Sequence, residues 1–346
     1  MIQDIAPDFL RNEYEPCEPR PGDWIFWFRG KDVLVQKAAF EDEKCLTFPE
    51  YGETESNSIS VQNRSERNRV DRKKMNQECK NPIVEDDFNG FLHRNCEGTE
   101  QLRILQGNLQ YLFRMRDQAC FLYQEPEGET KSECPEGWLF VPVRSLRFVD
   151  QKSACMAGAT AYHLWQWYRD NRFCGRCSNM LMHGEKERMF FCPHCGNMVF
   201  PKIAPAVIVA VIDPEKEQIV MTKYADRAFK KYALIAGFTE IGETAEQTVE
   251  REVMEEVGLS VKNITYYKSQ PWGFDSNLLM GFFAELSGSN LITREEKELS
   301  VAEWMPREQL ADMDDGISLT REMMGEFYRC GNAVLSMPTD YQKFPY

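Results

Sequence analysis

The chain has 346 residues, and its 41 Lys and Arg against 55 Asp and Glu give a formal net charge of −14 at pH 7. Hydrophobic residues make up 42% of the sequence, which is typical of a globular protein and not of a disordered or fibrous one. So acidic a chain is a poor general partner for nucleic acids or anionic membranes, unless a local basic patch overrides the total. The longest apolar run, 206–212, is too short to span a bilayer, and no basic region precedes an apolar stretch at the start. We therefore predict a cytoplasmic protein without a signal peptide.

Residues 1–150 are predicted to form a β-rich N-terminal domain. Alternating apolar residues on either side of turn signals predict one hairpin over 24–35 and another over 111–123. Between them lies a polar insertion at about 52–98, in which 64–74 carries six basic residues against two acids. Such a run is typical of a solvated loop or short helix, and a nucleic-acid-binding arm is the alternative.

Residues 151–171 are predicted to form a connecting helix, because small and apolar residues recur there at helical spacing. A short ribbon follows over 172–200. Its two C-x-x-C pairs are formed by Cys174, Cys177, Cys192 and Cys195. Four thiolates can surround one zinc ion and close its coordination sphere, which predicts one structural Zn²⁺ that also supplies folding free energy. A redox pair of disulfides is the alternative. The other cysteines have no regular spacing and are expected to be reduced thiols.

Residues 201–346 alternate strand and helix patterns, which predicts an α/β domain. The clearest helix is expected over 245–257, where alanine and valine recur at every fourth position and form a buried stripe. Thr244 and Gln247 have the spacing of a capping box at its start, and Gly258 is placed to end it.

The same helix carries an excess of acids. Glu252 and Glu256 lie four residues apart and share a face, with Glu255 beside them and Arg251 placed to pair with Glu255. From Gly237 to Glu256 there are seven acidic residues and one basic residue. Acids on one face repel one another unless something neutralises them, and Mg²⁺ or Mn²⁺, which prefer oxygen ligands, would do so. A solvated acidic helix is the alternative.

The segment 236–259 resembles the Nudix box, Gly-x5-Glu-x7-Arg-Glu-U-x-Glu-Glu-x-Gly-U with U bulky and aliphatic, at every defined position. The resemblance implies a Nudix α/β/α sandwich that hydrolyses a nucleoside diphosphate linked to another group with the help of Mg²⁺ or Mn²⁺. It implies metal ligands at Ala236 (through its carbonyl), Glu252, Glu255, Glu256 and Glu298. It also implies a box carboxylate at Glu243, an orienting role for Arg251, and a general base at Glu255 or Glu256.

A four-cysteine ribbon directly before such a domain resembles the NADH pyrophosphatase (NAD⁺ diphosphatase) group. That group carries Ser-Gln-Pro-Trp-Pro-Phe-Pro-x-Ser after the box, and residues 269–277 match five of its eight defined positions. The substrate contacts that this implies are Gln270, Pro271, Trp272, Gly273, Phe274, Asp275, Ser276, Asn277, Phe200 and Thr320. We expect Trp272 and Phe274 to offer exposed ring faces for stacking, and packing in the core is the alternative. The replacement of two of the group's prolines is expected to loosen the loop.

The sequence thus predicts an enzyme that hydrolyses the pyrophosphate of NAD(H), a small-molecule dinucleotide, to nicotinamide mononucleotide and AMP. One alternative is a broader hydrolase of ADP-ribose or NAD-capped RNA, and another is a non-catalytic nucleotide-sensing zinc-ribbon protein. Capped RNA would require basic surface near the box, where the obvious cluster is expected to be a solvated edge: Lys223, Arg227, Lys230 and Lys231. The resemblance also implies a homodimer, and no membrane partner is expected.

Overall fold

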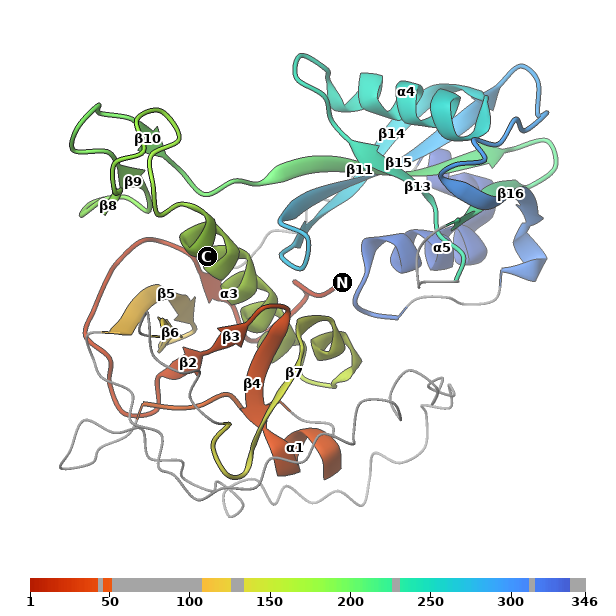
Figure 1. The fold of residues 1–346 in the computed structure, drawn as a ribbon. Helices are drawn as coiled ribbons and strands as arrows, with labels where there is room; N and C mark the ends of the chain where they lie inside the picture. Colours follow the sequence, from red (N-terminus) through yellow and green to blue (C-terminus); the bar gives the residue numbers. More distant parts are fainter. Residues whose placement is uncertain (43–45, 52–107, 126–133, 226–230, 311–314, 337–346) are drawn as a thin grey trace. The chain divides into compact units, whose positions relative to one another are not determined.

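The computed structural model describes residues 1–42, 46–51, 108–125, 134–225, 231–310 and 315–336. The chain divides into two compact units, Phe9–Gln151 and the combination of Met1–Asp8 with Lys152–Tyr346 (Figure 1). The predicted insertion at about 52–98, with its basic stretch, lies outside the described residues. In the ranges that are described, no helix has the length and apolar character needed to cross a membrane.

The described residues of the unit Phe9–Gln151 form two small sheets and two short helices. The first sheet has the order β1-β5-β6-β2, with β1 Leu10–Arg11, β5 Leu109–Met115, β6 Gln118–Tyr123 and β2 Trp24–Phe26. The second has the order β3-β4-β7, with β3 Phe28–Arg29, β4 Asp32–Gln36 and β7 Trp138–Pro142; the helices are α1 Lys37–Asp42 and η3 Val143–Phe148. Both predicted hairpins are confirmed, β3 with β4 and β5 with β6. The first predicted strand is divided at buried Trp27, however, because β2 pairs with β6 while β3 pairs with β4.

The predicted connecting helix is confirmed as α3, Lys152–Asp170. The cysteine ribbon follows it as a three-stranded sheet of order β10-β9-β8, with β8 Met182–His183, β9 Phe190–Phe191 and β10 Met198–Val199. Buried Phe190 attaches this sheet to α3, because its ring lies 4.8 Å from that of Trp167 and 5.8 Å from that of Tyr168.

A six-stranded sheet forms the C-terminal α/β domain, with the order β14-β15-β11-β12-β16 and with β13 also paired to β11. Its strands are β11 Ala204–Asp213, β12 Gln218–Tyr224, β13 Ile235–Phe238, β14 Ser260–Trp272, β15 Asn277–Ser287 and β16 Leu299–Pro306. The helices are α4 Ala245–Val257, η4 Arg307–Gln309, α5 Leu319–Cys330 and η5 Gly331–Ser336. Strands β11 and β15 are parallel, whereas β14 pairs with β15 and β12 with β16 in antiparallel fashion.

The central strand β11 is apolar on both faces because a helix covers each of them. Its odd-numbered valines, such as Val209, pack in one core cluster with the α4 stripe that includes Val253. Its even-numbered residues, such as Ile208, pack in a second cluster with α5 residues that include Met323. Figure 1 shows α4 and α5 on opposite sides of the sheet. The predicted α/β/α sandwich, preceded by a four-cysteine ribbon and a β-rich N-terminal part, is confirmed.

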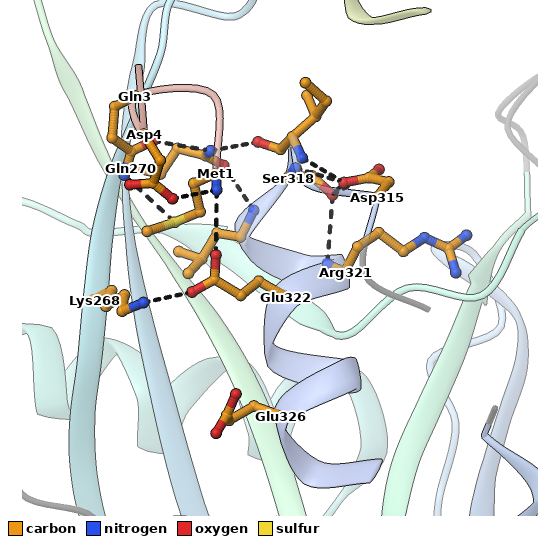
Figure 2. A network of polar contacts seen from close by, with 12 residues as sticks. Met1, Gln3, Asp4, Lys268, Gln270, Asp315, Ser318, Arg321, Glu322 and Glu326 are labelled. Carbon is orange, nitrogen blue, oxygen red and sulfur yellow. Dashed lines mark hydrogen bonds and ion pairs between the residues drawn. The ribbon is translucent and has the colours of Figure 1, made fainter. Parts of the chain in front are cut away.

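The segment Met1–Asp8 belongs to the unit of this α/β domain and is held at α5 (Figure 2). The Ile2 N–H donates to the carbonyl of Ile317 at 2.9 Å, and the Met1 amino group lies 3.4 Å from Glu322 Oε2. Lys268 also donates to Glu322, at 2.7 Å. Although burial raises the pKa of Glu322, these cationic neighbours outweigh burial, and its pKa lies below the usual range.

Candidate active site

The box helix α4 begins and ends where the sequence predicted. The Thr244 hydroxyl accepts a hydrogen bond from the Gln247 N–H, and the Gln247 side chain accepts one from the Thr244 N–H, so the capping box is complete. Gly258 ends the helix with φ of 67°, a conformation that favours glycine, and its N–H donates to the Met254 carbonyl. These local contacts fix the two ends of the helix that carries the box acids.

Four glutamates line a cleft of about 380 Å³ beside α4: Glu252, Glu255, Glu295 and Glu298. Glu255 is exposed, whereas Glu252 and Glu256 are buried, with 9% and 3% of their surface accessible. Glu298 is among the residues predicted from the sequence, whereas Glu295 is not; the backbone N–H of Glu295 donates to the Glu256 carbonyl at 2.9 Å. The acidic run at 295–298 was the available signal for it.

A single guanidinium connects the box acids. Arg251 donates to Glu243 at 2.6 Å, to Glu252 at 2.7 Å and to Glu255 at 3.0 Å, and the last pair was predicted from i, i+4 spacing. It also donates to the carbonyl of Phe238 at 2.8 Å, which ties the helix to the end of β13. The hydrogen bond from Arg251 lowers the pKa of Glu243 to about 2. Burial, which Arg251 only partly opposes, raises the pKa of Glu252.

The first glycine of the box leaves room for one of the acids. A Cβ added to Gly237 would lie 1.9 Å from the carboxyl carbon of Glu252, so a side chain here would displace that carboxylate. The neighbouring Ala236 N–H points at Glu256 Oε1, 3.4 Å away. Because the N–H and C=O of one strand residue point to the same edge of the strand, the Ala236 carbonyl also faces the box acids. Ala236 and Gly237 of β13 therefore lie directly against the carboxylates of Glu252 and Glu256.

The four ribbon cysteines converge as predicted. The sulfur atoms of Cys174, Cys177, Cys192 and Cys195 all lie within 4.8 Å of one another, and Cys174 and Cys192 are buried. The side-chain amide of Asn179 lies 3.4 Å from the Cys177 sulfur, and a hydrogen bond of this kind orients a metal-binding thiolate. The spacing and the closed set of thiolates fit a structural zinc ion.

The expectation of exposed ring faces in the loop 269–277 is wrong. Trp272 and Phe274 are 8% and 5% exposed, and their rings pack edge-to-face at 5.0 Å. The indole N–H of Trp272 donates to Asp275 at 3.1 Å. Gln270 is fully buried and bridges the Ile317 carbonyl and the Leu319 N–H, both at 2.8 Å, so that it holds the start of α5. These side chains face the interior because the loop packs against other elements.

The loop lies directly against α3. A Cβ on Gly273 would lie 2.2 Å from the Ala159 carbonyl oxygen, and Gln166 donates to the Ser276 hydroxyl at 3.4 Å. Pro271 and Asp275 are exposed, and Ser276 and Asn277 are half-buried. Phe200 is 49% exposed at the end of the ribbon. Thr320 lies in the first turn of α5, which covers the sheet face opposite α4, so the fold does not bring it to the box acids.

Comparison with known proteins places these features in one family. Residues 202–324 match the model of the NUDIX domain. Over 161 residues the chain is 38% identical to the NAD-capped RNA hydrolase NudC of Pectobacterium carotovorum subsp. carotovorum, a match that covers 46% of this chain and 61% of that protein. Over 182 residues it is 34% identical to the NAD-capped RNA hydrolase NudC of Edwardsiella ictaluri, covering 53% of this chain and 69% of that protein.

Among solved structures, a NUDIX hydrolase from Nitrosomonas europaea is similar to 46% of this chain, with 90% of its own chain covered. The two share 21% sequence identity, with a TM-score of 0.38. This chain spans about three fifths of the length of the first of these NudC relatives.

Proposed function

Because the chain belongs to the NudC group of the Nudix hydrolases, we propose that it hydrolyses the pyrophosphate bond of NAD(H) to nicotinamide mononucleotide and AMP. The observation that carries this proposal is the cleft lined by four glutamates, with one arginine holding three acids of the box. A cleft of this charge would repel a pyrophosphate unless cations lay between them.

The acids fit divalent cations for a physical reason. Burial of Glu252 and Glu256 makes two charges on one helix face costly, and Arg251 is already shared among three acids. We propose that Glu252, Glu255, Glu256, Glu298 and the Ala236 carbonyl hold Mg²⁺ or Mn²⁺. Such ions, when bound, lower the pKa of a water and offset charge on the bridging phosphates. Glu295 lines the same cleft and extends the set.

The remaining steps use side chains of this chain. A box glutamate, Glu255 or Glu256, accepts a proton as the water oxygen bonds to one phosphorus; the bond from that phosphorus to the bridging oxygen breaks, and the oxygen leaves with the other phosphate. Arg251 orients the acids and, through Glu243, the loop before the helix. Glu255 is exposed in the cleft and Glu256 is buried, so Glu255→Gln and Glu256→Gln can be compared. Loss of the base should lower kcat with the Mg²⁺ requirement unchanged, whereas loss of a ligand should raise the Mg²⁺ concentration that gives half-maximal rate.

Trp272 and Phe274 are buried, so we propose that other aromatic residues contact the rings of the dinucleotide. Among the residues that the structure describes around the cleft and the loop, two exposed rings are Phe200, at 49%, and Phe238, at 55%. Phe238 ends β13 and its carbonyl binds Arg251, so it lies beside the box. We propose these two rings, with exposed Pro271 and Asp275, as the substrate-contacting side chains.

NAD-capped RNA is a second candidate substrate, because that is what the names of the NudC relatives state. The bond to be hydrolysed is the same pyrophosphate bond as in free NAD(H). Of the basic cluster that the sequence offered near the box, Arg227 and Lys230 lie outside the described residues, and Lys223 lies 4.0 Å from the centre of the Tyr232 ring. A homodimer, which the resemblance implies, is part of this proposal and is tested by sedimentation.

Product analysis with Mg²⁺ or Mn²⁺ tests the proposed function directly. NADH, NAD⁺, ADP-ribose and an NAD-capped RNA are supplied separately, and products are identified by mass. We expect nicotinamide mononucleotide from NAD(H), with AMP, and from capped RNA, with a 5′-monophosphate strand. Cleavage of ADP-ribose alone, or no cleavage by a zinc-loaded wild type, would contradict the proposal.

A further inference from the structure

The outer face of the cysteine ribbon carries a continuous row of apolar side chains. The strand register sets Met182 opposite Phe191 and Phe191 opposite Met198. Directly opposed residues on antiparallel strands point to the same face, so these three share one side. An isolated bridge sets Phe173 opposite Met180, which precedes Met182 by two residues and so lies on that side too. We name these five residues, Phe173, Met180, Met182, Phe191 and Met198, the ribbon face.

The ribbon face is exposed although the opposite face is packed. Phe173, Met180, Met182 and Met198 are 59%, 64%, 52% and 59% exposed, and Phe191 between Met182 and Met198 is half-buried. On the other side of the same strands, Phe190 is buried against α3 and its ring lies 4.6 Å from that of His183. The ribbon is therefore attached to α3 without using the ribbon face. A contiguous exposed patch of aromatic and methionine side chains is typical of a binding surface.

The charge around the ribbon face is opposite in sign to that of the chain. Residues 172–202 contain five basic and two acidic residues, a net +3 in a chain of −14, so the remainder carries −17. A filled cysteine cluster would add a charge of about −2, which leaves the segment positive. The exposed cations are Arg172, Arg176, Lys186 and Lys202. The Arg172 guanidinium lies 5.9 Å from the centre of the Phe173 ring, so a cation and an exposed ring stand together.

We propose that the ribbon face binds single-stranded nucleic acid, with phosphates at the flanking cations and a base stacked on Phe173. Exposed aromatic rings beside cations bind single strands of any sequence, because every base has a flat face that can stack and every phosphodiester group carries a negative charge. The proposal rests on the proposed function, since among its substrates only an NAD-capped RNA has a strand beyond the cap. The glutamate cleft repels such a strand, and the ribbon supplies the attraction that the cleft lacks.

Binding is tested by fluorescence anisotropy on the zinc-loaded full chain, with an uncapped single-stranded RNA about 12 nucleotides long. We expect Phe173→Ala to weaken binding by about tenfold, as removal of a stacking ring does. The double variant Arg172→Glu with Arg176→Glu should weaken binding and also reduce the slope of log affinity against log salt, by about 0.7 for each phosphate that is no longer bound. A merely structural role would not change that slope.

Matched controls separate the ribbon face from general surface effects. Phe148→Ala removes a ring that is 56% exposed in the other unit, and Lys216→Glu reverses an exposed charge in the turn after β11. Both should bind RNA as the wild type does. Phe173→Leu, which keeps an apolar side chain but no ring, is the second variant should the alanine variant lose zinc. The KM for capped RNA should rise in the ribbon variants, while the KM for free NADH stays unchanged.

Two results would overturn the inference. One is wild-type RNA affinity in both Phe173→Ala and the arginine double variant. The other concerns the double variant Met182→Lys with Met198→Lys. If this variant sedimented as a monomer where the wild type is a dimer, and its RNA affinity were unchanged, the ribbon face would be a contact between copies of this chain. Measuring the hydrolysis of free NADH distinguishes failure of the ribbon inference from failure of the proposed function. Failure of RNA binding with NADH hydrolysis intact removes only the ribbon inference, and binding without hydrolysis of any substrate removes the proposed function.

Discussion

Gly237→Ala should inactivate the enzyme while leaving it folded. The added Cβ would lie 1.9 Å from the Glu252 carboxyl carbon and 2.0 Å from its Oε1, where real contacts stay above 3.0 Å. The obstructing group is the end of a flexible side chain, so the carboxylate moves away by about 1 Å. A displacement of that size at a reacting centre can lower the rate by about a hundredfold. We therefore expect kcat for NADH to fall by that order and the Mg²⁺ requirement to rise.

The stability of this variant should change little. The backbone of Gly237 lies outside the left-handed region, so alanine can adopt it, and the smaller entropy of the unfolded chain favours folding by about 0.4–1 kcal/mol. Against this stands the hydrogen bond from Arg251 to Glu252, a charged interaction for which about 1.5–3 kcal/mol is typical and which is partly exposed here. A net loss of about 1 kcal/mol would lower Tm by only a few degrees, roughly 2–4 °C.

Gly281→Ala is the matched control. It also adds a Cβ to a crowded strand glycine, 2.8 Å from the Met323 sulfur, but on the side of α5. It should lower Tm without changing kcat or the Mg²⁺ requirement. The assay is steady-state hydrolysis of NADH over a Mg²⁺ series, with melting curves recorded in chelator. If Gly237→Ala kept wild-type kcat and Mg²⁺ dependence, Glu252 would not act from the position in which the structure holds it.

Four further changes test other parts of the chain. Glu256→Gln should keep the circular dichroism spectrum of the wild type and lose nearly all turnover. If its kcat stayed above about a tenth of wild type, the activation free energy would have risen by less than about 1.4 kcal/mol, and this acid would not be essential. Cys192→Ser should lose the zinc found by metal analysis after dialysis, and its Tm should fall. Arg251→Gln removes the partner that lowers the pKa of Glu243, and a lowered carboxylate pKa stabilises the fold at pH values above the ordinary carboxylate pKa. The Tm difference from wild type, measured in chelator, should therefore be largest near neutral pH and disappear as pH falls to about 2, the pKa of Glu243. Trp272→Ala should destabilise the fold by about 3–5 kcal/mol, as for other buried aromatic residues, and should affect NADH and ADP-ribose equally; a KM effect on NADH alone, without a fall in Tm, would show that the ring faces the substrate.

The box helix could be predicted to the residue because its signals are local. A capping pair three residues apart, a valine at every fourth position and a glycine at the end each act within one or two turns. The same holds for the ribbon, where two C-x-x-C pairs bring four sulfur atoms within 4.8 Å of one another. Glu295 was missed because its place in the cleft depends on a backbone hydrogen bond to Glu256, between segments far apart in the sequence.

The exposure of the loop 269–277 could not be read from its own residues. The loop packs against α3 at Gly273, and α3 comes more than a hundred residues earlier in the chain. The division of the first predicted strand at Trp27 has a similar cause, because the partners of its two halves, β6 and β4, belong to different sheets. Local pattern predicts that a strand or loop exists, and distant packing decides its partners and its faces.

At Gly273, packing against α3 and not the stiffness of the loop residues holds the loop in place. The replacement of two prolines was expected to loosen the loop, but the site has no room for a proline ring, because a Cβ there would lie 2.2 Å from the Ala159 carbonyl oxygen. Glycine lets the backbone of the loop approach that of α3, and Trp272 and Phe274 on either side of it are buried. The loop is thus held by burial against a helix and not by the stiffness of its own residues. Since α3 also contacts the ribbon through Trp167, one helix supports both the loop 269–277 and the cysteine cluster, and a larger residue at position 159 should disturb the loop without touching any acid of the box.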